Sequence, residues 1–454
     1  MAIGLLSFRR RPVLELADLP GIPVAAAHVQ TLAGPEAFRL RLLELIGQAR
    51  TRILISVLYL QDDLAGRELL QALYDAKAAR PALDIRVFVD WHRARRGLIG
   101  KTKSPGNAAF YQEMATRLGP GVPIRGLPVQ TRELLGVMHL KGFVLDDQVL
   151  YSGASLNNDY LDRQGRYRLD RYHLIQSREL ADSMAGLLTE VVQADPAVQP
   201  LDRHPHPGKA ALGAAIARFR VRLKKASYDF APGPATPADL RITPLIGLGR
   251  SGNALNRTLL QLIQGAQDRI VLFTPYFNLP RLLNKAIRDR LKAGCRVTII
   301  LGDKTANDFF IPPSEPFRTI AALPYLYELN LRRFCKAQQR AIDQGLLDLQ
   351  LWKDGDNTFH QKGIWVDGQW TLLTGNNLNP RAWWLDLENG LLIRDPEGRL
   401  RDQHERELAG ILAHTRRLAS WKELESIDDY PVPVKRLLKR LTRPLIDRLV
   451  NQVL

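Results

Sequence analysis

The sequence predicts an α/β protein built from two tandem copies of one unit, each a mixed sheet flanked by helices, related by a pseudo-twofold axis. Two observations predict this fold class. The segment "LLELIGQARTRILISVLYL" (42–60) aligns with "LLQLIQGAQDRIVLFTPYF" (259–277) at an offset of 217 residues (259 − 42). Further along each half, "HLKGFVLDD" and "HQKGIWVDG" repeat the same polar residues at the same spacing. Repetition at a constant offset indicates a duplicated structural unit.

The elements of each unit follow in the same order. Each aligned segment reads as an amphipathic helix followed by a strand, because apolar residues first recur at helical spacing and then form a short continuous run. The strands "LDIRVFVDW" and "CRVTIILGD" follow, and a β-hairpin carries the repeated polar residues. The predicted boundaries are a first unit over 1–205, a linker with a basic helix and a Pro/Gly-rich connection over 206–240, a second unit over 241–426, and a basic amphipathic helical tail over 427–454.

The hairpins carry the first candidate site residues. Side chains two apart on a strand point to the same face, so His139 and Lys141 are expected to project together. One histidine on a strand is most often a buried residue with a structural partner. A second pair, His360 and Lys362, occurs 221 residues later (360 − 139) in the same context, which favours a functional site.

Two histidines facing each other suit phosphoryl chemistry. A neutral imidazole can attack phosphorus, and a second histidine can protonate the departing group and later deprotonate the acceptor. The neighbouring lysines would hold the non-bridging oxygens and neutralise the charge that develops on them. This chemistry requires neither a metal ion nor another cofactor, and we expect none.

Further polar residues repeat around the two pairs. Asn157 and Asn379 follow the hairpins and are expected to donate hydrogen bonds to the same oxygens. Asp170 in "LDRYHLIQ" aligns with Glu388 in "LENGLLIR", and these acids are the candidates for holding the second ring nitrogen of each histidine. Asp146 and Asp367, five residues beyond the lysines, are predicted to brace the hairpin turns.

Charge and composition indicate where the protein acts. The 64 Lys+Arg residues exceed the 47 Asp+Glu residues and give a net charge of +17, which implies an anionic partner. The two cysteines have no metal-type or disulfide spacing, as expected in a reducing cytoplasm. With no signal sequence and no run of about 20 apolar residues, the protein is expected to be cytosolic or to lie on a membrane surface.

Two segments are candidates for that surface. The tail "VPVKRLLKRLTRPLIDRLVNQVL" is predicted to form basic amphipathic helices of interfacial type, with docking on the protein's own core as the alternative. The sequence "DFFIPPSEPF" places Phe309, Phe310 and Ile311 in a loop, which would insert in a bilayer, line an apolar entrance or pack beneath a helix.

The doubled His-x-Lys-x4-Asp pattern, followed by "SGASLN" and "TGNNLN", resembles the phospholipase D superfamily. Longer stretches such as "VDWHRARRGLIG", "GDKTANDFFIP" and "TGNNLNPRAWWLDLEN" are similar to its Gram-negative-type phosphatidylserine synthase branch. The resemblance implies transfer of a phosphatidyl group from CDP-diacylglycerol to L-serine through a phosphohistidine, with release of CMP, at the cytoplasmic face of the inner membrane. It makes His139 the nucleophile and His360 the general acid, although the symmetry of the sequence permits the reverse.

The chain departs from the superfamily's usual Gly-Ser-x-Asn ending. Gly153 and Asn157 lie one residue further apart than in that ending, and the second copy has Asn376 and Asn377 where serine is expected. Which asparagine faces the phosphate is therefore open.

Five further residues are candidates for binding substrate. Trp91, Arg93 and Arg95 follow a repeated strand, at the place where loops of α/β units often contact ligands. The arginines are candidates for the pyrophosphate and the tryptophan for stacking on cytosine, with a solvated basic loop as the alternative. Lys304 and Asn307 occupy the corresponding loop of the second unit.

Other functions stay open at this point. They are a phosphodiesterase acting on nucleic acid, a phosphatidyltransferase for another alcohol or for water, and an inactive protein that only binds anionic membranes. Aromatic residues interleaved with a basic groove, as single-stranded nucleic acids require, are not evident, so no nucleic acid is expected. A cardiolipin synthase would be expected to carry N-terminal membrane spans. Both motifs lie in one chain, so the site needs no oligomer.

Overall fold

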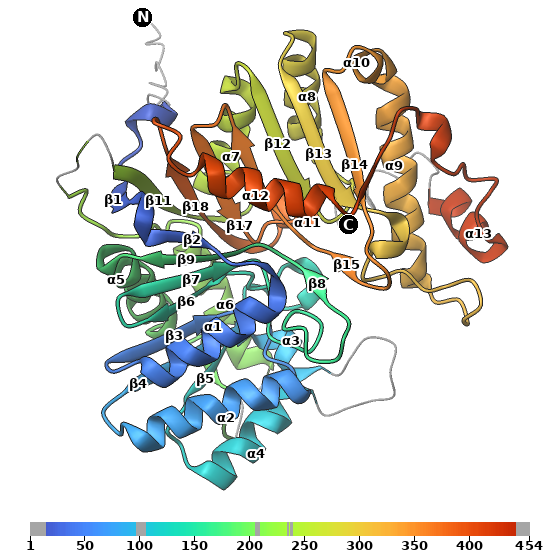
Figure 1. Cartoon of the computed structure of the whole chain (residues 1–454). Helices are drawn as coiled ribbons and strands as arrows, with labels where there is room; N and C mark the ends of the chain where they lie inside the picture. The colour runs from blue at the N-terminus through green and yellow to red at the C-terminus, as the bar shows by residue number, and fades with distance from the viewer. Residues whose placement is uncertain (1–14, 97–105, 205–208, 234–235, 237–238, 442–454) are drawn as a thin grey trace, which may run out of the picture.

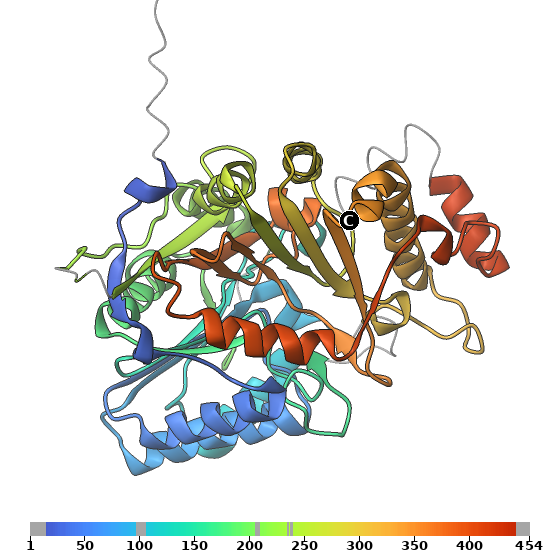
Figure 2. The same cartoon turned by 45° about the horizontal axis from the view of Figure 1, so that its top comes forward.

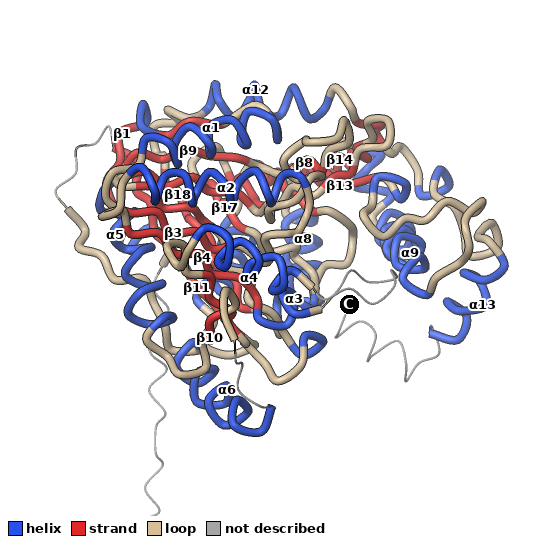
Figure 3. Tube along the Cα trace, turned by 90° about the horizontal axis from the view of Figure 1, so that it is seen from below, coloured by secondary structure: helices blue, strands red, loops and turns tan. Residues whose placement is uncertain are grey.

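Two large mixed sheets, each covered by helices, make up the computed structural model (Figure 1). The structure describes residues 15–96, 106–204, 209–233, 236 and 239–441. The first half of the chain supplies one sheet and the second half supplies most of the other. The strands gather in the middle of the molecule with helices around them (Figure 3). The predicted α/β class with two tandem units is confirmed.

The two sheets share one topology. The first has the order β10-β5-β4-β3-β6-β7-β9-β2 and the second the order β1-β11-β18-β17-β16-β12-β13-β14-β19. The first comprises β2 (Val29–Thr31), β3 (Arg52–Ser56), β4 (Asp84–Asp90), β5 (Ile124–Leu127), β6 (Gly142–Leu145), β7 (Gln148–Ser152), β9 (Tyr172–Gln176) and β10 (Gln199–Pro200). The second comprises β1 (Ile22–Ala25), β11 (Asp239–Leu248), β12 (Arg269–Thr274), β13 (Arg296–Gly302), β14 (Leu347–Trp352), β16 (Gly363–Val366), β17 (Trp370–Thr374), β18 (Leu387–Arg394) and β19 (Thr415–Arg417).

The repeated topology brings the same positions to one edge of each sheet. In the first sheet β3, β4 and β5 are parallel, whereas β6 runs antiparallel to β3 and is followed by the antiparallel strands β7 and β9. β12, β13, β14, β16, β17 and β18 repeat this arrangement. The start of the hairpin, its end and the start of the following strand therefore meet where the first parallel strand ends.

Helices follow the strands in both halves. Those of the first half are α1 (Gly34–Gln48), α2 (Leu64–Ala79), α3 (Trp91–Arg95), α4 (Asn107–Leu118), α5 (Arg178–Gly186) and the linker helix α6 (Lys209–Leu223). Those of the second half are α7 (Ala254–Gly265), α8 (Arg281–Lys292), α9 (Leu323–Ala337), α10 (Gln339–Asp343), α11 (Pro380–Trp384), α12 (Arg401–Leu412) and α13 (Val432–Leu441). Figure 2 shows α12 crossing the front of the molecule above α1 and α2.

Helix ends are fixed by side chains that accept backbone hydrogen bonds, as N-caps do. The carboxylate of Asp63 accepts from the Gly66 N–H at the start of α2, and the amide oxygen of Asn253 accepts from the Asn256 N–H at the start of α7.

The chain crosses between the two units near its N-terminus. β1 pairs antiparallel with β11 at the edge of the second sheet, whereas β2, four residues later, pairs with β9 of the first. The short strands β8 (Arg168–Leu169) and β15 (Thr358–Phe359) also pair across the halves. The boundary of the first unit stays a prediction, but one strand within 1–205 belongs to the other unit's sheet.

The linker and the tail both pack against the protein. In α6, Leu212, Ile216 and Phe219 join the large hydrophobic cluster that contains the first sheet and reaches β11 and β18 of the second. In α13, Val434 and Leu438 are buried against Tyr325 and Leu326. The predicted tail therefore docks on the protein's own core as far as it is described, and its residues 442–454 lie outside the described part of the chain.

Candidate active site

The two histidine–lysine pairs lie at the matching edges of the two sheets, and all four side chains are buried. His139 and Lys141 occupy an extended segment just before β6, and His360 and Lys362 lie between β15 and β16. The prediction that they sit on the strands is therefore wrong by a few residues. The reason is contact with the other half: the His139 N–H donates to the Leu387 carbonyl (2.9 Å), so this segment joins β18 before it enters its own sheet.

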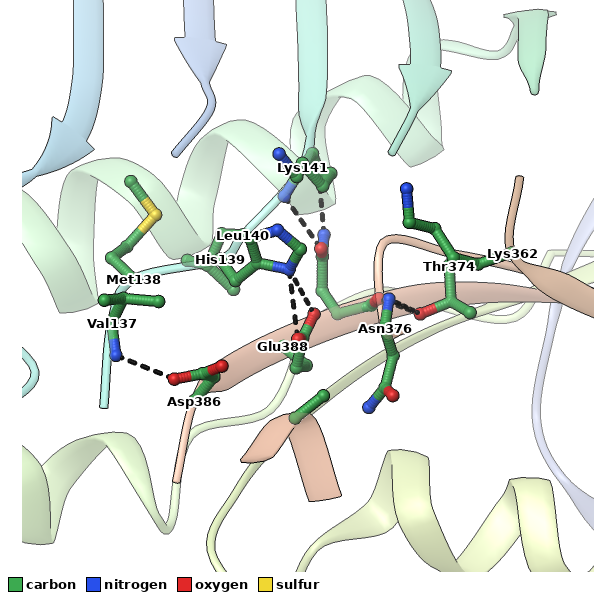
Figure 4. A network of polar contacts seen from close by, with 12 residues as sticks. Val137, Met138, His139, Leu140, Lys141, Lys362, Thr374, Asn376, Asp386 and Glu388 are labelled. Carbon is green, nitrogen blue, oxygen red and sulfur yellow. Dashed lines mark hydrogen bonds and ion pairs between the residues drawn. The ribbon is translucent and has the colours of Figure 1, made fainter. Parts of the chain in front are cut away.

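His139 is held by an acid from the opposite half. Its Nδ1 lies 2.9 and 3.0 Å from the carboxylate oxygens of Glu388, the second residue of β18 (Figure 4). Contact through Nδ1 leaves Nε2 as the ring nitrogen that can meet a substrate. The sequence identified Glu388 as an orienting acid, but it did not indicate that this acid would serve the histidine of the other unit.

His360 has a different set of partners. Its Nδ1 lies 2.9 Å from the Tyr160 hydroxyl and 3.6 Å from the nearer carboxylate oxygen of Asp170, both from the first half. The Lys362 ammonium contacts the same nitrogen and donates to that carboxylate at 2.7 Å. Asp170 is thus shared between the histidine and the lysine. Tyr160 was not foreseen, because no repeated position marks it.

Lys141 is fixed by its own half and by the facing one. Its ammonium donates to the Ala154 carbonyl (3.1 Å) and lies 3.2 Å from the Ser155 hydroxyl. Gly375 of the second unit packs on its stem so closely that an added Cβ would lie 2.8 Å from the lysine Cγ. Glycine is therefore required at this contact between the halves.

Asn389 is a site residue that sequence reasoning missed. Its side-chain oxygen accepts from the Lys141 N–H at 2.8 Å, and its amide nitrogen donates to the Lys141 carbonyl at 2.8 Å and to the Tyr228 hydroxyl at 2.9 Å. A polar side chain directly after Glu388 on a buried strand was the available signal. The equivalent residue of the first half is Arg171, which instead pairs with Glu407 (2.6 Å).

Asp90 also holds the segment that carries His139, and the sequence did not identify it. Its buried carboxylate accepts from the Met138 N–H (2.9 Å), next to His139, and from the Arg93 N–H (2.8 Å). Burial raises the pKa of Asp90 to about 6.

Burial and the two lysines govern protonation at the centre. Burial, reinforced by Lys141 and Lys362, lowers the pKa of His139 well below its usual value. Burial and Lys362 lower the pKa of His360 to about 4. Both rings are therefore neutral near pH 7, which leaves a nitrogen lone pair for attack on phosphorus or for taking up a proton.

The lysines and acids are shifted by the same forces. Burial, followed by repulsion from Lys362, lowers the pKa of Lys141 to about 7, and burial also lowers the pKa of Lys362. Burial raises the pKa of Asp170, but Lys362 and His360 outweigh it and hold that pKa below the usual range. Burial raises the pKa of Glu388 well above its usual value, with Asp386 adding to the effect.

The asparagines have divided roles. The side-chain oxygen of Asn157 accepts from the Tyr160 N–H (3.0 Å), and that of Asn379 caps α11 by accepting from the Ala382 N–H (2.9 Å). The side-chain oxygen of Asn376 accepts from the Leu378 N–H (2.8 Å), while its amide nitrogen is buried without a hydrogen-bond partner among the described residues. Asn376 therefore has a buried amide donor without a partner in the described structure, but Figure 4 shows its side chain pointing away from Lys141 and Lys362.

Asp146 and Asp367 lie at the hairpin turns, away from the histidines, with φ of 51° and 54°. The Asp146 carboxylate accepts from the backbone N–H groups of residues 50–52 and from the Thr51 hydroxyl. That of Asp367 accepts from the N–H groups of residues 267–269. Each tethers its hairpin to the start of the first parallel strand, as was predicted of bracing residues.

The side chains of the candidate substrate residues are engaged with other parts of the protein. Trp91 is 2% exposed, and the Arg95 guanidinium covers its ring at 4.4 Å, so burial in the first core prevents it from stacking on a base. The Arg93 guanidinium lies over the Tyr59 ring (5.1 Å) and 3.7 Å from Glu133.

In the second unit the Lys304 ammonium pairs with Glu328 (2.9 Å) and Glu425 (2.6 Å). The side chain of Asn307 accepts from the Phe309 N–H (2.9 Å). Both residues stabilise the loop that carries the Phe309–Ile311 cluster. That cluster is half-buried, with the Phe310 ring 6.3 Å from the Tyr325 ring.

Two absences apply to the described residues only. They contain no group of three or more His, Cys, Asp or Glu side chains placed to hold a metal ion. None of their helices combines the length and the apolar character needed to cross a membrane.

Comparison with known proteins identifies the family. The model of the family described as "Cardiolipin synthase, PLD-like domain" matches twice, over residues 42–189 and 259–412. The chain is 49% identical to CDP-diacylglycerol–serine O-phosphatidyltransferase PssA of Escherichia coli (strain K12), covering 98% of this chain and 99% of that one. It is 46% identical to the CDP-diacylglycerol–serine O-phosphatidyltransferase of Haemophilus influenzae, covering 99% and 100%. The crystal structure of phosphatidylserine synthase from Haemophilus influenzae Rd KW20 matches with a TM-score of 0.94 over 97% of this chain and 98% of that one. The chain therefore belongs to the PLD-like family, in the branch that contains these phosphatidylserine synthases.

Proposed function

We propose that this protein is a CDP-diacylglycerol–serine O-phosphatidyltransferase, which transfers the phosphatidyl group of CDP-diacylglycerol to the hydroxyl of L-serine and releases CMP. The observation that carries the proposal is the meeting of two buried histidine–lysine pairs, each oriented from the opposite half, in a chain 49% identical to an enzyme of that name.

In the first step His139 is the nucleophile. Its Nδ1 proton, held against Glu388, leaves the Nε2 lone pair to attack the phosphorus that carries diacylglycerol. A P–N bond forms and the P–O bond to CMP breaks. Direct contact with a carboxylate supports this choice of histidine, because it fixes both the tautomer and the ring orientation.

As CMP departs in that first step, His360, protonated when the anionic pyrophosphate raises its pKa, gives its Nε2 proton to the CMP oxygen. In the second step serine replaces the imidazole. The neutral His360 ring then takes the proton of the serine hydroxyl, whose oxygen attacks phosphorus as the P–N bond breaks. The shared Asp170 and the Tyr160 hydroxyl at Nδ1 support such an exchange of protons.

The charge on phosphorus is met by the lysines and one amide. Lys141 and Lys362 would hold the non-bridging oxygens, and an asparagine amide from the segments after the hairpins, that of Asn157 or Asn379, would donate to one of them. All these groups belong to one chain, so a second subunit is not needed to complete the site.

The test is release of CMP from CDP-diacylglycerol in mixed micelles, with and without L-serine, for the wild type and His139→Ala. Serine-dependent CMP and phosphatidylserine, both lost in the variant, are expected. CMP release that is indifferent to serine, with phosphatidic acid as the lipid product, would instead indicate a hydrolase or a transferase for another alcohol. Cleavage of a nucleic-acid phosphodiester without any turnover of the liponucleotide would replace the proposal.

We also propose that the protein associates peripherally with an anionic membrane surface, the cytoplasmic face of the inner membrane in a cell with two membranes. Arg436, Lys439 and Arg440 are exposed on α13, and Phe317, which is 41% exposed, extends the loop that packs beside it. Because Val434 and Leu438 are buried against the protein, this part of the tail is expected to act through charge.

Sedimentation with anionic liposomes tests this second proposal. Replacing Arg436, Lys439 and Arg440 by glutamine should weaken binding at low salt, and the difference should shrink as ionic strength rises. The control replaces three exposed basic residues elsewhere: Arg178, Lys285 and Arg399. Equal binding by the two triple variants would show that the basic residues of the tail do not contribute specifically to membrane binding.

A further inference from the structure

A second basic cavity lies outside the histidine–lysine centre. It has a volume of about 660 Å³ and is bounded by α8, α9, α11 and the loop after β12. Four arginines line it: Arg250 before α7, Arg281 and Arg288 on α8, and Arg333 on α9. None of its lining residues bonds to the two histidines or their lysines in the described structure.

The four guanidinium groups are not held in ion pairs in the part of the chain that the structure describes. Within the described residues none of them forms an ion pair, although other basic residues on the same helices are engaged. Asp289, next to Arg288, pairs with Lys285 at 2.5 Å, and Arg332, next to Arg333, donates to the Leu424 carbonyl at 3.1 Å. Unpaired cations around one cavity repel each other, and an anion bound among them removes that cost.

The rest of the lining defines the ligand further. Asn278, Asn284 and Asn330 add amide groups that can donate hydrogen bonds beside the arginines. Phe277, Phe334 and Trp384 supply an aromatic wall, and the Arg250 guanidinium stacks over the Trp384 ring at 4.4 Å. A phosphate group suits planar guanidinium donors, and an aromatic wall suits an apolar group attached to it.

We propose that this cavity is a second anion-binding site, which takes the phosphate group of a ligand with an apolar or aromatic part. A phospholipid headgroup and a soluble phosphate ester share this chemistry. The site is separate from the centre at which phosphoryl transfer is proposed, so its occupancy can be measured without turnover.

Arginine-selective labelling with phenylglyoxal measures how accessible each arginine of the cavity is. The full-length protein is labelled alone and with dihexanoyl phosphatidate below its micelle concentration, with CMP, or with inorganic phosphate, and each arginine is quantified by peptide mass spectrometry. At saturation we expect labelling of Arg281, Arg288 and Arg333 to slow about tenfold, since bound guanidinium groups are withdrawn from reagent. Arg178, whose side chain is 73% exposed on α5, should label unchanged.

The three ligands distinguish the sources. Protection by the short-chain lipid alone identifies a lipid headgroup, whereas protection by CMP or inorganic phosphate at similar concentration identifies a soluble phosphate. If none of the three slows labelling of the cavity arginines more than that of Arg178, the proposal is wrong.

A matched pair of variants separates the cavity from general surface charge. Arg288→Gln/Arg333→Gln should raise the ligand concentration that half-protects Arg281 by about tenfold or more, because two charge-assisted contacts are lost. Lys292→Gln/Lys336→Gln removes the same charge from α8 and α9 at residues that do not line the cavity, and should leave that concentration unchanged. Equal shifts in the two variants would contradict a defined site.

Discussion

The two histidine centres contain the same residue types at the same spacing but differ in their contacts. His139 meets its acid directly, at 2.9 Å from Glu388, and Lys141 is bonded to uncharged oxygens. In the other centre the acid Asp170 is bound by Lys362, at 2.7 Å, and the hydroxyl of a tyrosine contacts His360. The duplication has kept the reacting groups, and their neighbours have made the two copies unequal.

This difference suggests how one repeated motif supports two roles. A nucleophile needs a ring held in one tautomer and orientation, which a direct carboxylate contact provides. A group that gives and takes protons needs a neighbour that can accommodate both states, which a shared carboxylate and a hydroxyl provide. The predictions that follow test this comparison.

The largest effect is expected from replacing each histidine in turn. His139→Ala should lower turnover by roughly 10⁴-fold and abolish covalent labelling by CDP-diacylglycerol carrying radioactive phosphate, because no nucleophile remains. His360→Ala should also lose turnover and form the labelled protein more slowly, because CMP departs without its general acid, but the label that forms should persist, since release of the intermediate lacks its base. Labelling of the first variant and not the second would reverse the assigned roles.

The two lysines should differ in their effect on folding. Lys362→Met leaves Asp170 buried without its ion-pair partner, and should lower the free energy of unfolding by about 3–5 kcal/mol. Lys141→Met removes no ion pair and should cost clearly less. Denaturant unfolding monitored by circular dichroism compares them. Equal losses of unfolding free energy would mean that the Lys362–Asp170 ion pair stabilises the fold no more than the contacts of Lys141 do.

Replacing Asn389 should change the position of Lys141 more than it changes the stability of the fold. Asn389→Ala removes both hydrogen bonds to the Lys141 backbone, and should lower kcat about tenfold to a hundredfold with little change in KM, because the ammonium is displaced from the phosphoryl oxygens. Asn389→Asp keeps the acceptor for the Lys141 N–H and should recover part of the loss. If only the thermal stability changed, Asn389 would support the fold and would not position Lys141.

The pH dependence should report on the first centre. With a pKa of about 7, Lys141 is charged below that pH and neutral above it. The value of kcat/KM should therefore fall about tenfold per pH unit on the alkaline side. A guanidinium stays charged there, so Lys141→Arg should flatten the alkaline limb at the cost of some activity. An unchanged limb would assign the titration to another group.

The smallest effect is expected where the two units are most alike. Asp146→Asn and Asp367→Asn each weaken a set of backbone contacts at a hairpin turn, and asparagine tolerates the same positive φ. Each should cost about 1–2 kcal/mol of unfolding free energy without altering kcat. A selective loss of activity in one variant would show that the hairpins are not equivalent supports.

Most of the architecture could be predicted because the sequence contains it twice. The aligned segments became α1 with β3 and α7 with β12, and the repeated polar residues marked the histidines, the lysines and both acids. The spacing of residues along the chain indicates which residues are neighbours within one unit, however. It does not indicate which surfaces of the two units come into contact. The pairing of Glu388 with His139, and the support from Tyr160 and Asn389, therefore could not be predicted.

One other expectation failed for a physical reason. Trp91 follows a strand at a position typical of ligand-binding loops, but the short helix α3 turns its ring into the first core.

The position of β1 bears on the order in which a nascent chain can fold. Its partner β11 ends at residue 248, so β1 stays unpaired until more than half of the chain has left the ribosome. Glu388, the acid that contacts His139, emerges later still. N-terminal units generally fold first during synthesis, and here the early unit would hold an unpaired strand and a histidine without its acid. The contact between His139 and Glu388 can therefore form only late in translation.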